Sequence, residues 1–187
     1  TLLLQLAMKA KGNPLYISGE ESEQQIKMRA LRLRSGQARL SHSDKDNLLL
    51  ISLSNTDACL QVIENTKPSL VIIDSIQTME SENLSGLSGS VGQVRYATAE
   101  FVKLAKRLNI PVIIVGHVTK EGMVAGPMIL SHMVDTVLFL EGEKFTRFRI
   151  LRSLKNRFGP VDEVGVFVMD ASGMMEVKHP EQTFLET

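Results

Sequence analysis

The fold class that the sequence predicts is α/β, with a mostly parallel central sheet, helices on both of its faces and antiparallel strands at its C-terminal edge. Up to Leu140, short apolar runs alternate with stretches of helical periodicity, as in parallel strands joined by helical crossovers. From Thr146 onward, extended segments are joined by glycine-containing turns, without long helices. A chain of 187 residues is long enough for one well-buried domain and short for two. We therefore expect residues 1–187 to form a single domain.

Each expected element has a local signal. The opening residues have helical apolar spacing without a preceding cap, so we expect the chain to begin inside a helix. Ser22 and Gln25 form a capping-box pattern for a helix to about Arg34. Later helices are expected from a cap at Thr56 or Asp57 to about Asn65, over the amphipathic positions 91–108, and as a short helix to about His132. The expected strands are residues 15–18, 48–53, 70–73, 111–116, 134–140, 147–154, 162–169 and 174–178.

Composition narrows the classes of protein. Equal numbers of basic and acidic residues, 21 of each, mean that an anionic partner must be bound by local basic patches. Cys59 is the single cysteine, which excludes an internal disulfide or a cysteine zinc site within this chain and suits a reducing cytosol. The apolar runs are strand-sized and the first residues do not resemble a signal peptide. We expect a soluble, cytoplasmic protein with no membrane partner.

The residues directly after the apolar strands are candidates for a site, because ligands of open parallel sheets bind beyond the carboxyl ends of the strands. Four apolar residues followed by Asp74 form the pattern of a Walker B strand, whose carboxylate holds the water shell of a nucleotide-bound Mg²⁺. Many strands end in Asp, so an ordinary strand end is the alternative.

Glu20 and Glu21 follow a neighbouring strand, where a carboxylate can orient and deprotonate the water that attacks a γ-phosphate. The alternative is that Glu21 and Glu23 only complement the N-terminus of the following helix. His117 follows the strand 111–116 and is either a γ-phosphate sensor or a structural histidine.

Two glycine-containing loops, 79–92 and 118–127, are candidates for contacts with the phosphates of single-stranded DNA, through Arg95, Lys120 and backbone amides. Few aromatic residues are nearby for base stacking, and disordered surface loops are the alternative. The segment KNRFGP, residues 155–160, follows the strand 147–154. Taken alone, it is a solvated basic turn.

Seven short motifs together resemble one family in order along essentially the whole chain, the bacterial RadA (Sms) family of DNA repair proteins. The motifs are Ser18-Gly19-Glu20-Glu21-Ser22, Ile72-Ile73-Asp74-Ser75-Ile76-Gln77-Thr78, Gly89-Ser90-Val91 with Gln93-Val94-Arg95, Gly116-His117-Val118-Thr119-Lys120-Glu121-Gly122, Ala125-Gly126-Pro127, His132-Met133-Val134-Asp135 and Lys155-Asn156-Arg157-Phe158-Gly159.

The resemblance implies a RecA-like P-loop NTPase core, which is a DNA-dependent, Mg²⁺-requiring ATPase related to DnaB-type helicases. It further implies that this ATPase forms hexameric rings, drives branch migration and works beside the RecA recombinase. By resemblance, Glu20 is the catalytic base, Asp74 the Walker B carboxylate and His117 the switch residue. Lys155 and Arg157 are fingers that reach the phosphates of a nucleotide bound to the neighbouring subunit. Loops beginning near Glu82 and Val118 bind single-stranded or branched DNA, with Arg95, Lys120 and Asn156 as expected contacts.

The chain departs from the family pattern in three ways. Met128 stands where the family usually has a basic residue, which weakens the expectation of a DNA contact there. The P-loop is expected immediately before Thr1, so Thr1 is expected beside the nucleotide and the chain as it stands should hydrolyse ATP poorly. The family's N-terminal zinc finger and C-terminal Lon-protease-like domain would also lie outside this sequence.

Two other functions are compatible with the same fold. One is a non-catalytic RecA-fold module that binds DNA or a partner protein without turnover. The other is a circadian-clock or signalling ATPase that acts on protein, against which the KNRFG motif argues.

Overall fold

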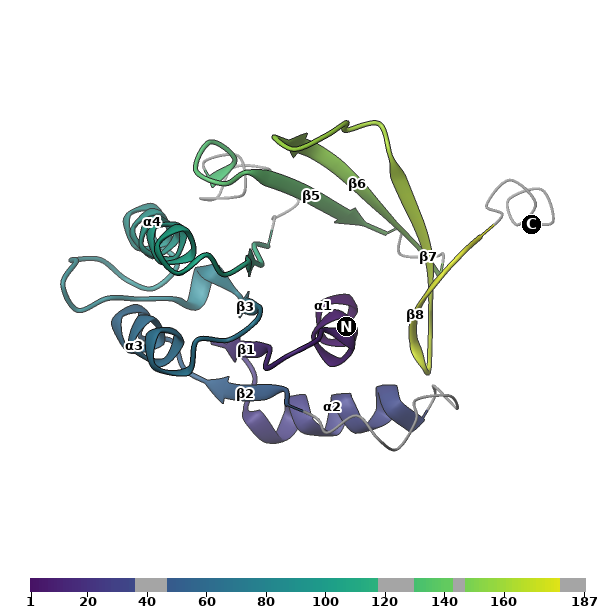
Figure 1. Cartoon of the computed structure of the whole chain (residues 1–187), viewed down its shortest axis with the longest axis horizontal. Coiled ribbons are helices and arrows are strands. Elements are labelled where there is room, and N and C mark those ends of the chain that lie inside the picture. The colour runs from purple at the N-terminus through teal and green to yellow at the C-terminus, as the bar shows by residue number, and fades with distance from the viewer. Residues whose placement is uncertain (36–46, 118–129, 143–146, 179–187) are drawn as a thin grey trace.

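The computed structural model describes residues 1–35, 47–117, 130–142 and 147–178. In this part of the chain, helices pack against the first of two four-stranded sheets (Figure 1). The helices are α1 (Leu2–Lys9), α2 (Glu23–Ser35), α3 (Thr56–Thr66) and α4 (Val91–Leu108), with a short 3-10 helix, η1 (Ile76–Thr78). The strands are β1 (Leu15–Ser18), β2 (Leu49–Ser52), β3 (Val71–Asp74), β4 (Val112–Ile114), β5 (Thr136–Glu141), β6 (Phe148–Asn156), β7 (Val164–Asp170) and β8 (Gly173–Glu176).

The first sheet is parallel, as predicted, with the strand order β2-β1-β3-β4. Its register places Ser18, the last residue of β1, opposite Asp74, the last residue of β3. The two strands therefore end at the same level, and the residues that follow them emerge side by side.

Helices cover both faces of this sheet, and alternate strand residues point to opposite faces. Leu15 and Ile17 of β1 belong to the core cluster that contains residues of α3 and α4. Tyr16, between them, belongs to a second cluster with residues of α1 and α2. Figure 1 shows α3 and α4 on one side of β1 and β3, and α1 and α2 on the other. Burial on both faces explains why these strands are almost continuously apolar.

The late strands form a sheet of their own. The antiparallel strands predicted for the C-terminal end are present, but they do not extend the parallel sheet: among the described strands β5 pairs only with β6, and β4 only with β3. The strands β5 to β8 pair antiparallel in chain order through short connections, so successive neighbours satisfy each other's backbone groups.

A buried glutamine joins the second sheet to α1. The side-chain amide of Gln5 donates to the carbonyl of Met174 at 3.1 Å and accepts from its backbone N–H at 2.9 Å. This exchange holds β8 against the first helix of the chain.

The helix starts confirm one prediction and correct another. Ser22 and Gln25 form the reciprocal capping box expected before α2, with bonds of 2.9 and 3.3 Å. The cap of α3 is Asn55, whose side chain accepts a bond of 2.9 Å from Ala58 N–H. Thr56 or Asp57 was therefore the wrong cap, because Asn55 is equally suited to capping and lies at the last extended residue.

Candidate functional site

A hydrogen bond from Gly19 links the ends of β1 and β3. The N–H of Gly19 donates to the carbonyl of Asp74 at 2.9 Å. A Cβ atom at position 19 would lie 1.9 Å from Oγ1 of Thr78, so a side chain does not fit there. Gly19 thus lets the loop after β1 approach the loop after β3.

Glu20 and His117 meet beyond these strand ends. Ser75 Oγ donates to Oε1 of Glu20 at 2.8 Å. His117 Nε2 lies 3.8 Å from the same oxygen, and the Glu20 and His117 side chains are 50% and 60% exposed. The structure therefore brings together Glu20, His117 and the residue next to Asp74, and leaves the carboxylate of Glu20 open to solvent.

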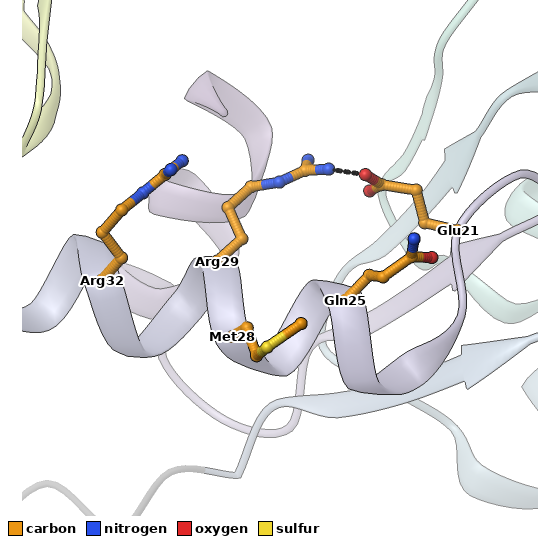
Figure 2. A pocket seen from close by; sticks show the side chains of 5 residues that line it. All are labelled: Glu21, Gln25, Met28, Arg29 and Arg32. Carbon is orange, nitrogen blue, oxygen red and sulfur yellow. Dashed lines mark hydrogen bonds and ion pairs between the residues drawn. The ribbon is translucent and has the colours of Figure 1, made fainter.

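Glu21 points elsewhere. Its carboxylate pairs with Arg29 of α2, as Figure 2 shows, and its N–H donates to Ser18 Oγ at 2.9 Å. The side chains of Glu21, Gln25, Met28, Arg29 and Arg32 line a surface hollow of about 380 Å³. Because a guanidinium neutralises Glu21, Glu20 is the carboxylate free to act on a ligand at the strand ends.

Asp74 has a partner that the sequence analysis missed. Tyr16, buried in β1, donates its hydroxyl hydrogen to Oδ2 of Asp74. Burial, and then this hydrogen bond, raise the pKa of Tyr16 above its usual value, so the phenol stays protonated as a donor. A tyrosine in an otherwise apolar strand was the available signal, since a buried hydroxyl usually finds a partner.

Thr1 lies near this group. The backbone nitrogen of Thr1 lies within electrostatic range of Asp74, Glu21 and Arg29. Its carbonyl accepts a bond of 3.1 Å from the N–H of Gln5 in the first turn of α1.

Among the described residues there is no group of three or more His, Cys, Asp or Glu side chains that could hold a metal ion by themselves. Mg²⁺ needs no such group, because it keeps several waters and binds through one or two carboxylates together with substrate phosphates. Asp74, oriented by Tyr16 at the strand end, suits that role.

The loop between η1 and α4 is hydrogen-bonded to the helix that follows it. Gln93, which is 1% exposed, accepts from the N–H of Ser81 at 2.9 Å. Its amide nitrogen donates to the carbonyls of Ser81, Leu84 and Gly86 at 3.1, 2.8 and 3.3 Å. Arg95 is exposed on the same helix. These hydrogen bonds hold residues 81–90, here called the shaped loop, in one defined conformation. The signal for it in the sequence was Gln93, a polar residue in the first turn of an amphipathic helix.

The KNRFGP turn has its partners in the segment before β5. Lys155 Nζ donates to the carbonyls of Ser131 and Val134 at 2.6 and 2.8 Å, and Arg157 forms an ion pair with Asp135 at 2.7 Å. Asn156 closes the turn, accepting from Phe158 N–H at 3.1 Å and donating to Pro160 O at 3.2 Å. The strand β6 ends at Asn156, within this segment, and Figure 1 shows the end of β6 apart from the ends of β1 and β3.

Several predicted features lie outside the described residues. They are Lys120, Met128, the whole loop 118–127 and the first residues of the predicted short helix to about His132. The structure therefore gives no geometry for these predictions.

The chain has clear sequence relatives. The model of a family described as "AAA domain" matches residues 3–123. The DNA repair protein RadA of Streptococcus pyogenes serotype M1 is 52% identical over 189 residues, which cover 100% of this chain and 40% of that protein. RadA of Streptococcus pneumoniae R6 is 51% identical (100% and 43%), and RadA of Bacillus subtilis 168 is 47% identical (100% and 40%). The chain thus spans well under half the length of these curated relatives.

Solved structures show the same fold at low identity. The RadB recombinase superposes with a TM-score of 0.66 at 19% identity, covering 95% of this chain and 84% of that one. A KaiC-like protein from Pyrococcus horikoshii OT3 superposes with a TM-score of 0.63 at 13% identity, covering 94% and 80%. These likenesses confirm the predicted RecA-like core. Within the described residues, no helix is both long enough and apolar enough to cross a membrane.

Proposed function

The chain belongs to the AAA domain family and to the RadA family of DNA repair proteins, and on that premise we propose that it is the DNA-dependent ATPase core of a RadA-type recombinational repair motor. We include in the proposal that residues 1–187 form one RecA-like domain. The observation that carries it is the meeting of Glu20, Ser75 and His117 beside Asp74 at the carboxyl end of the parallel sheet.

In this proposal Glu20 orients and deprotonates the attacking water. The carboxylate is half exposed, so water reaches it, and Ser75 Oγ fixes the direction of one of its oxygens. A base must lie within hydrogen-bond reach of the water it activates, and Glu21, held by Arg29, is turned away from that position.

In this proposal Asp74 would hold the water shell of Mg²⁺, and the hydrogen bond from Tyr16 keeps the Asp74 carboxylate oriented. Bound Mg²⁺-ATP would supply the electrophilic phosphorus and the charge neutralisation of the β- and γ-phosphates. His117, within reach of Glu20, is suited to sense the phosphate end of the nucleotide.

Lys155 and Arg157 act on the nucleotide of a neighbouring subunit in this proposal. Their turn lies apart from the strand ends of its own chain (Figure 1), which supports action in trans within a homo-oligomer, for which we propose a hexameric ring. A guanidinium that reaches the transferring phosphoryl group stabilises the charge of the transition state.

The proposed substrate is single-stranded or branched DNA, contacted by residues 81–90 with Arg95, by the loop that begins near Val118 and by Asn156. A preformed loop loses less conformational entropy on binding, and the hydrogen bonds of Gln93 supply that shape. The proposal also includes branch migration, a DnaB-like helicase action, cooperation with the RecA recombinase and a cytoplasmic location. A zinc finger in a separate N-terminal region belongs to the same proposal.

The test is steady-state ATP hydrolysis by the full-length protein, as its gene encodes it, with and without single-stranded DNA and beside its Arg157→Ala variant. We expect hydrolysis that DNA stimulates and that the substitution abolishes, together with DNA affinity that falls steeply as salt rises. Absence of hydrolysis at every DNA concentration would contradict the motor. DNA binding without turnover would instead support a non-catalytic RecA-fold module.

A further inference from the structure

Gln77, in the middle of η1, contacts both the candidate nucleotide site and the shaped loop. Its side-chain Nε2 donates to the backbone carbonyl of His117 at 2.9 Å. Its own backbone carbonyl accepts a bond of 3.2 Å from Ser88 Oγ in the loop 81–90. One residue therefore links the segment that follows β4 to the candidate DNA loop.

The segment that carries Gln77 is also attached to the catalytic group. Ser75, two residues earlier, donates to Glu20, and Ile76 N–H donates to the carbonyl of Val115 at 2.8 Å. Thr78 Oγ1 donates back to the carbonyl of Ser75 at 2.8 Å. A displacement of Glu20 or His117 would thus move a short segment that is tied at several points, and Gln77 would pass the movement to Ser88.

The other end of the Gln77 side chain is unpaired. Among the described residues, its Oε1 is buried without a hydrogen-bond partner. The amide orientation is set by the His117 carbonyl, which can only accept a bond. An unpaired buried acceptor is unfavourable, so it marks a place where a donor can arrive in another state of the site.

We propose that Gln77 is a positioning residue that transmits the state of the nucleotide site to the loop 81–90, and so couples ATP turnover to bound DNA. This inference rests on the proposed function. Gln77 touches neither nucleotide nor DNA in this scheme. Its contacts hold His117 on one side and Ser88 on the other.

The experiment uses the full-length protein and measures ATP turnover without DNA, turnover with saturating single-stranded DNA, DNA affinity by fluorescence anisotropy, and the melting temperature. The main variant is Gln77→Leu, which keeps the size of the side chain and removes both polar atoms. Gln61→Leu, at an exposed position of α3, is the matched control. We expect Gln77→Leu to keep DNA-free turnover and DNA affinity, while the ratio of turnover with DNA to turnover without it falls toward one.

Each outcome decides the inference. Normal stimulation in Gln77→Leu would overturn it and leave the proposed function standing, whereas an unaltered protein that DNA does not stimulate would overturn both. If Gln77→Leu does not fold, Gln77→Glu decides, because it keeps the side-chain length and places an acceptor against the His117 carbonyl. A folded Gln77→Glu protein with normal stimulation would overturn the inference, and one with normal DNA affinity and no stimulation would support it.

Discussion

Lys155 donates a hydrogen bond of 2.6 Å from its ammonium group to the backbone carbonyl of Ser131, and a second of 2.8 Å to that of Val134. Arg157, two residues later, forms an ion pair with Asp135 in which both side chains are about half exposed (50% and 42%). The two cations of one motif are therefore held differently: Lys155 supports the segment before β5, whereas Arg157 lies at the surface.

We predict that Lys155→Ala and Arg157→Ala affect stability differently. Lys155→Ala removes charge-assisted bonds to two carbonyls and should lower the free energy of unfolding by about 1.5–3 kcal/mol. Arg157→Ala removes an exposed ion pair, worth roughly 0.2–1 kcal/mol. Thermal unfolding of the two variants, beside ATP turnover, separates the roles. Equal stability losses would show that Lys155 does not support the segment.

We predict that the two adjacent glutamates are not equivalent. Glu20→Gln removes the proposed general base and should lower kcat by roughly 10²–10⁴-fold, with nucleotide affinity retained. Glu21→Gln weakens an ion pair with Arg29 that is turned away from the site, so its kcat should fall far less. Steady-state kinetics with nucleotide-binding titrations test this. A larger loss of kcat in Glu21→Gln would reverse the assignment.

We predict that Gln93 stabilises the loop 81–90. Gln93→Leu leaves the buried N–H of Ser81 and the partly buried carbonyl of Leu84 without this partner, and a buried group left unpaired costs about 1–3 kcal/mol. Urea unfolding should show the loss, and limited proteolysis should become faster within the loop. Gln61→Leu, an exposed change of the same type, should stay within about 0.5 kcal/mol of the unaltered protein. Unchanged proteolysis in Gln93→Leu would contradict the prediction.

We predict that Cys59 resists alkylation in the folded protein. Burial raises its pKa from the usual thiol value of 9.0 to about 12, so little thiolate forms at pH 8.5. Iodoacetamide should react slowly with Cys59 in the native protein and quickly in urea, as mass spectrometry of the peptide containing it would show. Equal rates would contradict the burial of this thiol.

The raised pKa of Cys59 also makes the free energy of unfolding depend on pH. The thiol ionises near pH 9 in the unfolded chain and near pH 12 in the folded one. Its contribution to stability is therefore complete below about pH 9 and is lost as pH rises toward 12. The Cys59→Ala variant has no thiol to ionise, so this loss is absent. Its free energy of unfolding should therefore fall less steeply with rising pH than that of the unaltered protein. Urea titrations at several pH values between 9 and 12 test this.

Much of the fold could be predicted from local patterns. Continuous apolar runs indicated β1 and β3, because strands covered on both faces have no polar side. The capping box located the start of α2, since both of its bonds join residues three positions apart. Asp74, Glu20 and His117 were found as candidates because each lies at the end of an apolar run or just beyond it, where ligands of parallel sheets bind.

The tertiary structure alone decided which groups meet. Whether Glu20 or Glu21 faces the site depended on Ser75, 55 residues away in the chain, and on Arg29 across the loop. The roles of Tyr16, Gln77 and Gln93 also depended on partners supplied by other elements. The sequence by itself determined the elements, whose signals are local in the chain, but side-chain partners are chosen by sheet register and helix packing, which bring distant residues together.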